Sequence, residues 1–246
     1  MNAVTAFSGR NTKEMLRDPL NLAFGLGFPV VLLLLLTAIQ RNIPVNLFQL
    51  ERLTPGIAVF GLSFISLFSA TLISKDRTTS FLMRLFASPM RASDYILGYT
   101  LPLIPMALAQ ALLCYLVAGL LGMQLTANVL LAILVSLPAA ALFIGIGLLC
   151  GSVFNDKQVG GICGALLTNL SAWLSGTWFD LDLVGGAFKK IAYALPFAHA
   201  VDAGRAAMSG EFAAIMPHLW WVIGYAVVAL VAAVLVFRKK MLRDNG

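Results

Sequence analysis

The residues that could do chemistry in this chain are few, and none stands in a catalytic motif. The two histidines are His199 and His218, and Asp202 lies close to His199 in the sequence. Such a pair can act as a general base, but no nucleophile motif accompanies it. We therefore interpret His199 as a loop residue with a satisfied hydrogen bond, and an enzyme built on these residues is the last of our alternatives.

Motifs for nucleotides and metals are also missing from the sequence. It contains neither the phosphate-binding pattern G-x-x-x-x-G-K-[ST] nor the zinc pattern H-E-x-x-H. Cys114, Cys150 and Cys163 lie in apolar runs without a C-x-x-C spacing, which predicts neither a disulfide nor a metal site. We expect a chain with no catalytic residue and no cofactor or metal of its own.

The composition excludes an ordinary soluble domain. Of the 246 residues, 60% are hydrophobic and 11% are charged, and the mean hydropathy is +0.89. Soluble proteins are roughly 45–50% apolar and about 25% charged, so lipid must cover part of this surface. The formal net charge is +6, but the basic residues crowd the ends of the apolar segments. That distribution indicates an anionic membrane surface and not nucleic acid.

The elements that position these residues are therefore membrane-spanning helices. A span needs about 20 mostly apolar residues, and the sequence predicts one all-α membrane domain over residues 1–246 with six transmembrane helices. The sixth apolar segment, at 159–176, is shorter and richer in Gly, Ser and Thr than the others. The predicted spans cover about 22–39, 54–74, 95–122, 129–154, 159–176 and 218–237.

The basic residues also predict the orientation. With the N-terminus inside, twelve of the 17 Lys and Arg residues lie on the cytoplasmic side and five on the other side. This bias follows the positive-inside rule, so both termini are expected in the cytoplasm. No charged residue lies deep within a span, which argues against an ion-coupled carrier.

Two cytoplasmic segments have helical patterns outside the spans. In the first, Asn11 and Glu14 resemble a capping box that starts a short helix ending before Pro19. Its basic residues favour an amphipathic helix lying on acidic headgroups. The second is the loop 75–94, where Phe81, Leu82, Leu85 and Phe86 form one apolar stripe. It could rest on the membrane surface or insert into the groove of a soluble partner.

The second span has two opposite faces. Serines at positions 63, 66 and 69 form one, and Phe60, Phe64 and Phe68 form the other. In the first interpretation the serines pack against another helix and the phenylalanines face lipid. In the second, the phenylalanines line the path of an apolar substrate. The candidate residues for such a path are Phe60, Phe64, Phe68, Asn169 and Trp173.

Three stretches resemble the type 2 family of ABC transporter permeases, the membrane subunits of type V exporters. Leu16–Leu36 contains Arg-Asp-Pro and a later Pro, and is similar to the family's approach to its first span. Lys75–Tyr99 resembles the family's cytoplasmic loop, although Asp76 stands where the family usually has Glu followed by Gly. Leu195–Phe212 resembles the external segment Pro…Val-Asp-x-x-Arg.

This resemblance implies a half-transporter without catalysis of its own. Two copies, or this chain and a paralogue, would pair with two separate ATPase subunits that bind ATP-Mg. The 75–94 helix would be the coupling helix, and 159–176 would be the fifth span, followed by an external re-entrant helical hairpin. The implied ATPase-coupling residues are Asp76, Arg77, Phe81, Leu82, Arg84, Leu85 and Phe86. The implied external motif is Pro196, His199, Asp202 and Arg205.

The expected function is that of a permease in the inner (plasma) membrane. It would move a lipophilic compound, such as a drug, an antibiotic, a lipid or a lipid-linked molecule, out of the cytoplasm or the inner leaflet. Efflux and multidrug resistance belong to this hypothesis, with membrane lipid as a further partner. The alternatives are a polysaccharide or glycolipid exporter, or a membrane-embedded binding or immunity protein that transports nothing.

Overall fold

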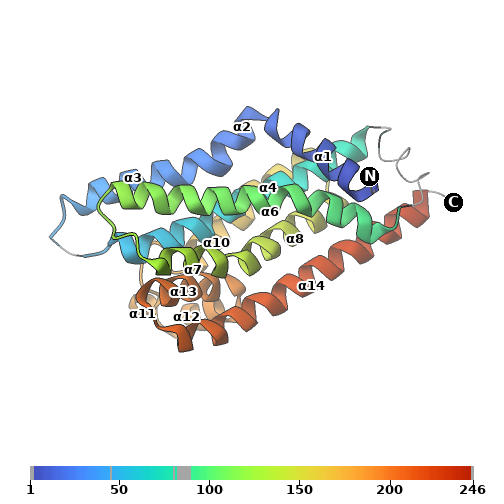
Figure 1. Ribbon diagram of the computed structural model, residues 1–246. Coiled ribbons are helices and arrows are strands. Elements are labelled where there is room, and N and C mark those ends of the chain that lie inside the picture. The colour runs from blue at the N-terminus through green and yellow to red at the C-terminus, as the bar shows by residue number, and fades with distance from the viewer. Residues whose placement is uncertain (1–2, 45, 80, 82–89, 245–246) are drawn as a thin grey trace.

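The protein is a bundle of helices (Figure 1). Its structure is a computed structural model that describes residues 3–44, 46–79, 81 and 90–244, and the side chains among them as far as residue 240. Over this part of the chain there is no strand, which agrees with the all-α prediction. The helices are α1 Ala3–Leu16, α2 Pro19–Leu22, the π-helix η1 Ala23–Gly27, α3 Phe28–Gln40, α4 Leu50–Thr78, α6 Ala92–Leu120, α7 Ala127–Val135, α8 Leu137–Val153, α9 Asp156–Val159, the π-helix η2 Gly160–Leu167, α10 Thr168–Leu174, α11 Leu181–Val184, α12 Gly186–Ala194, α13 Pro196–Ser209 and α14 Phe212–Asp244.

Five stretches are long and apolar enough to cross a membrane within the described residues. The predicted sixth span, at 159–176, forms α9, η2 and α10 in succession and does not meet that criterion of length and hydropathy. The physical reason is that the helix ends at Leu174 and begins with Asp156, Lys157 and Gln158, so any window of span length includes strongly polar side chains that lower its mean hydropathy. The five stretches are Pro19–Gln40, Leu50–Thr78, Ala92–Leu120, Ala127–Val153 and Phe212–Lys240.

Helix α4 is the centre of the bundle. Of its most apolar stretch, 89% is buried inside the protein, against 22–44% for the other four. It packs against α8, α6, α13, η2 and α3. The two labelled termini lie at one end of the bundle, and α11, α12 and α13 gather at the other (Figure 1).

The close packing of α4 on α8 depends on small residues. Ser66 and Ser69 are fully buried, and the Ser69 hydroxyl donates to the Ile144 carbonyl at 2.9 Å. A Cβ atom on Gly147 would clash with the Ser66 carbonyl and the Ser69 hydroxyl. A Cβ on Gly151 would clash with the backbone of the next turn of α4. The prediction that the serine face packs against a helix is confirmed.

The opposite face of α4 does not contact lipid. Phe60, Phe64 and Phe68 are all buried, so the lipid-facing interpretation is wrong. Phe64 packs edge-on against Phe28 at 5.3 Å between ring centroids, and Phe24 stacks near it. Helical periodicity predicts the two faces of α4 but not what covers them. The aromatic face is covered by α3 and η1, whose Phe28 and Phe24 pack against it.

The start of the chain also differs from the expectation. Helix α1 begins at Ala3, so Asn11 lies in its interior and does not cap it. Asn11 is fully buried, together with Phe7 and Met15. These residues are spaced by four and therefore share one helix face, which α1 turns towards α6.

We predict that Gly147→Ala destabilises the protein. The added methyl group meets the backbone of α4, which cannot move like a flexible side chain, and such overpacking costs typically about 1–3 kcal/mol. Thermal unfolding in detergent should show a lower midpoint. The control is Gly224→Ala in α14, where a Cβ meets no atom within 4 Å; equal midpoints for the two variants would contradict the prediction.

Candidate functional site

A partly buried ion pair joins α1 to the C-terminal end of α4. The Arg10 guanidinium donates two hydrogen bonds to the Asp76 carboxylate, at 2.6 and 2.7 Å. The Tyr99 hydroxyl of α6 donates a third to the same carboxylate at 2.8 Å. Asp76 is only 3% exposed, so its negative charge depends on these donors in place of water. Three helices therefore meet at one carboxylate.

The electrostatics at Arg10 reflect this pairing. Burial alone lowers the pKa of the guanidinium, but the hydrogen bond and the charge of Asp76 outweigh it and hold the pKa above its ordinary value. Glu14 adds a weaker ion pair at 3.4 Å, one turn along α1. Arg10 therefore stays charged, as a bidentate partner of a carboxylate should.

Apolar and amide contacts reinforce the junction of α1 and α6. The Phe7 ring packs edge-on against Tyr99 and Tyr95, with centroids 4.9 and 5.8 Å away. The Asn11 side chain donates to the Gly98 carbonyl at 3.1 Å. A Cβ on Gly98 would clash with the Phe7 ring. The helix predicted to lie on headgroups is thus docked into the bundle by one face.

Arg77 joins the same end of α4 to α8. Its guanidinium donates to the Gly151 and Phe154 carbonyls, at 2.9 and 3.1 Å, where α8 ends. The last carbonyls of a helix lack partners within it, so Arg77 satisfies them. Asp76 and Arg77, predicted to contact an ATPase, both bind within this chain.

The predicted coupling helix lies largely outside the described residues. Of its apolar stripe only Phe81 is described; the ring lies 4.4 Å from the Arg10 guanidinium, which covers its face. After the loop, the Asp94 carboxylate accepts from the Arg91 amide at 2.8 Å as α6 begins. Leu82, Arg84, Leu85 and Phe86 fall among the residues that are not described.

The residues predicted for a substrate path lie in two places. Phe60, Phe64 and Phe68 are buried under α3 and η1, with Trp178 closing one end against Phe60 at 5.3 Å. Asn169 and Trp173 are exposed on α10, on a different surface. The structure does not bring the two groups together within this chain.

The external motif forms a connected cluster at the opposite end. The Asp202 carboxylate lies 3.6 Å from Arg205 and accepts from the Tyr193 hydroxyl at 2.8 Å. Arg205 also donates to the carbonyls of Gly176 and Arg52, at 2.8 and 3.1 Å. Burial lowers the pKa of Arg205, and the negative charge of Asp202 partly offsets this effect. Pro196 is the first residue of α13, which carries this cluster.

The fold and these two clusters can be compared with known families. The family model of the ABC-2 type transporter matches residues 2–209. The chain belongs to the ABC-2 type transporter family. No curated protein sequence matches it. As an ABC-2 type membrane domain, it is the multi-pass permease component of an ABC transporter.

The sequence patterns do not identify the residues that hold this ABC-2 domain together at the C-terminal end of α4. The basic residues of the first helix, Arg10 among them, are expected on headgroups, and no motif marks Tyr99. One signal was present in the sequence: the spacing of Phe7, Asn11 and Met15 places them on one face of a helix. An amide among apolar residues on such a face indicates a protein partner, because lipid offers it no hydrogen bond.

We predict that Arg10→Met lowers the stability of the permease strongly. It leaves the buried Asp76 charge without its cation; breaking a fully buried pair from one side costs about 3–5 kcal/mol, and a smaller loss is expected here because the Arg10 side chain is 32% exposed. The double variant Arg10→Met/Asp76→Asn should be more stable than Arg10→Met alone, because the unpaired charge is removed. Thermal unfolding midpoints of the four proteins in the double-mutant cycle measure this. Lys13→Met on the exposed face of α1 is the control, and additive effects would count against a buried pair.

The two histidines of the chain meet between α13 and α14, at the opposite end of the bundle from Asp76. His199 Nε2 lies 3.0 Å from the Tyr193 carbonyl, and its Nδ1 lies 2.8 Å from His218 Nδ1. A carbonyl can only accept, so Nε2 carries the hydrogen and neutral His199 accepts from His218 at Nδ1. Burial lowers the pKa of His199, and His218 adds to this effect, while the Tyr193 carbonyl and the Asp202 charge oppose it.

We therefore predict that acid destabilises this end of the permease. A folded-state pKa below the unfolded value means that unfolding takes up protons, so stability is present above about pH 6.5 and is lost as the pH falls through the folded pKa. Unfolding midpoints between pH 7.5 and pH 5 should decline in wild type and decline less in His199→Gln. Parallel profiles for the two proteins would show that His199 does not cause the decline.

Proposed function

We propose that this chain is the permease of an ATP-driven exporter in the inner (plasma) membrane. It would move a lipophilic compound and couple that movement to ATP hydrolysis in separate ATPase subunits. The observation that carries the proposal is the anchoring of α4 beside the loop that follows it. Asp76 and Arg77 tie that end of α4 to α1, α6 and α8. A partner that pushes on the loop therefore moves four helices together.

A six-helix topology with both termini inside fits the contacts of the fifth apolar segment. At one end, Asp156 accepts from the Ser74 hydroxyl near the cytoplasmic end of α4, at 2.9 Å. At the other end, Thr177 packs so closely on Gly56 that a Cβ there would clash with it. The α4 segment between these contacts is about 27 Å long at 1.5 Å per residue, close to the thickness of the hydrocarbon layer. The segment 156–177 thus runs the length of a span, and α11–α13 would form the external hairpin.

A second copy of the chain, or a paralogue, fits the exposed stripe on α10 and η2. Leu166, Asn169, Leu170 and Trp173 are all exposed and recur at helical spacing. An exposed amide and an indole in a span suit a protein surface or a polar ligand better than lipid. In a dimer this stripe would face the partner, and the substrate would pass between the copies.

The substrate proposed is lipophilic because the candidate path is aromatic. Phe60, Phe64 and Phe68 form a continuous ring-lined face on α4, closed by Phe28 and by Trp178. Opening this face would require α3 to move away from α4. The π-helix η1, which precedes α3, is a kind of irregular turn that is frequent at functional sites.

The test of coupling changes the loop after α4 but leaves the contacts of Asp76 and Arg77 in place. Leu82, Leu85 and Phe86 are changed together to Gln, and Phe81 is kept because it packs under Arg10. Each apolar side chain buried in a partner's groove contributes roughly 1.5–3 kcal/mol, so co-purification with the ATPase should fall at least tenfold while membrane insertion is retained. ATPase stimulation by lipophilic compounds in the reconstituted complex should be lost as well.

The matched control changes three exposed apolar residues at the opposite end, Leu47, Leu183 and Val184, to Gln. Co-purification should then remain at the wild-type yield. If the cytoplasmic variant also co-purifies at that yield, the 82–86 segment lies on lipid and the proposed coupling fails. If a catalytically inactive ATPase leaves the phenotype of the cell unchanged, the chain acts without transport.

A further inference from the structure

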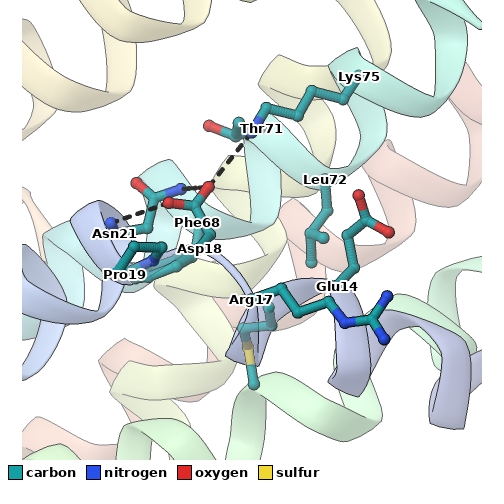
Figure 2. A pocket seen from close by; sticks show the side chains of 10 residues that line it. Glu14, Arg17, Asp18, Pro19, Asn21, Phe68, Thr71, Leu72 and Lys75 are labelled. Carbon is teal, nitrogen blue, oxygen red and sulfur yellow. Dashed lines mark hydrogen bonds and ion pairs between the residues drawn. The ribbon is translucent and has the colours of Figure 1, made fainter.

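A cavity of about 290 Å³ lies between α1, α2 and the cytoplasmic part of α4. Figure 2 shows charged and polar side chains around it, with Phe68 and Leu72 between them. Phe68, Leu72 and Met15 are buried and form its apolar floor. The residues that line it are Glu14, Met15, Arg17, Asp18, Pro19, Asn21, Phe68, Thr71, Leu72 and Lys75.

Most of the charges around the cavity are already paired. Lys75 Nζ donates to Asp18 at 3.2 Å, and Asn21 donates to the same carboxylate from its backbone and side-chain amides, at 3.1 and 2.8 Å. Burial alone raises the pKa of Asp18, but these donors lower it below its ordinary value. Glu14 faces Arg10. The acidic groups of the site are therefore neutralised from within the chain.

Arg17 is the charge that remains. Its side chain is exposed, and it makes no ion pair with any residue that the structure describes. It also borders a second hollow on α1, where Lys13 lies one turn away on the same face. Lys75 has three N–H donors and uses one of them on Asp18. The cavity thus offers a free guanidinium and spare ammonium donors, which suit a phosphate group.

The surroundings identify the source of that phosphate. Leu16 and Leu20 flank Arg17 and are 61% and 67% exposed, and Phe24 follows on the same helical stretch at 46%. Such apolar exposure at the start of a membrane-crossing stretch suits contact with acyl chains. The first membrane-crossing stretch begins at Pro19, so the cavity lies where headgroups meet the hydrocarbon layer. A free phosphate would use the cations but gain nothing from the apolar floor and rim.

We propose that this cavity binds the phosphodiester headgroup of an inner-leaflet phospholipid, with Arg17 and Lys75 on the phosphate and the acyl chains along Leu20 and Phe24. The bound lipid joins α1 and α2 to α4, next to the Arg10–Asp76 pair. It is a component of the folded permease and is independent of the cargo that is transported. The site is thus assigned to a lipid that stabilises the resting bundle.

The experiment uses the full chain, delipidated in detergent and titrated with dioleoyl phosphatidylglycerol under native mass spectrometry. One saturable lipid is expected. Arg17→Gln should weaken its binding about tenfold, the loss expected for a charge-assisted hydrogen bond. Thr71→Phe keeps every charge but fills the cavity, and should weaken binding as well. Lys157→Gln removes an exposed charge beside Asp156, at the same end of the bundle but outside the cavity, and should bind as wild type does.

Competition identifies which part of the lipid is recognised. Dioleoylglycerol, which lacks the phosphate, should not displace the bound lipid, and neither should inorganic phosphate at millimolar concentration. Displacement by inorganic phosphate would show a simple anion site and overturn the lipid assignment. Equal affinity of wild type and Arg17→Gln, or equal weakening by Lys157→Gln, would show general attraction to a basic surface and overturn the site.

Discussion

The Asp76 carboxylate sets the arrangement of α1, α4 and α6 at the C-terminal end of α4. A carboxylate buried at the end of a membrane helix is stable only with donors on several sides. Those donors come from α1 and α6, through Arg10 and Tyr99. Because both helices must reach the same two oxygen atoms, the position of α1 against α4 follows from this one group. Phe7 and Asn11 then complete the contact with α6.

Helix α4 is held at its N-terminal end as well. Arg205 of α13 donates to the Arg52 carbonyl in the first turn of α4 and to the Gly176 carbonyl beyond α10. Between the two ends, Ser69 and Gly147 allow α8 to approach its backbone closely. In lipid the association of helices depends on such packing and hydrogen bonds. Lipid tails are as apolar as the helix surfaces, so the hydrophobic effect does not drive the helices together. Helix α4 is thus held by contacts along its length. An arginine of a neighbouring helix binds it at each end, Arg205 at one and Arg10 at the other.

The outer helices differ from α4 in both exposure and regularity. The first membrane-crossing stretch is mostly exposed and contains η1, and the fifth apolar segment contains η2. Pro29 is the second residue of α3, which follows η1, and Pro138 lies where α7 gives way to α8, whereas Pro102 and Pro105 leave α6 continuous. Exposure alone does not explain these irregular turns, because α14 is a continuous α-helix although only 22% of its most apolar stretch is buried. The proposed transport requires α3, which follows η1, to move away from α4.

The sequence by itself determined that the chain is an all-helical, multi-pass membrane protein, and its motifs indicated the ABC-2 family that the family model confirms. Composition, run length and the two faces of α4 are local properties, and they survive in any tertiary arrangement. What covers each face was decided only by the tertiary structure. Phe60 and its neighbours are covered by α3 and not by lipid, and Asp76 is bound by Arg10. The physical reason is that lipid tails and apolar side chains solvate a hydrophobic face almost equally well. A helical pattern in the membrane therefore shows that a face is apolar without showing which neighbour it meets.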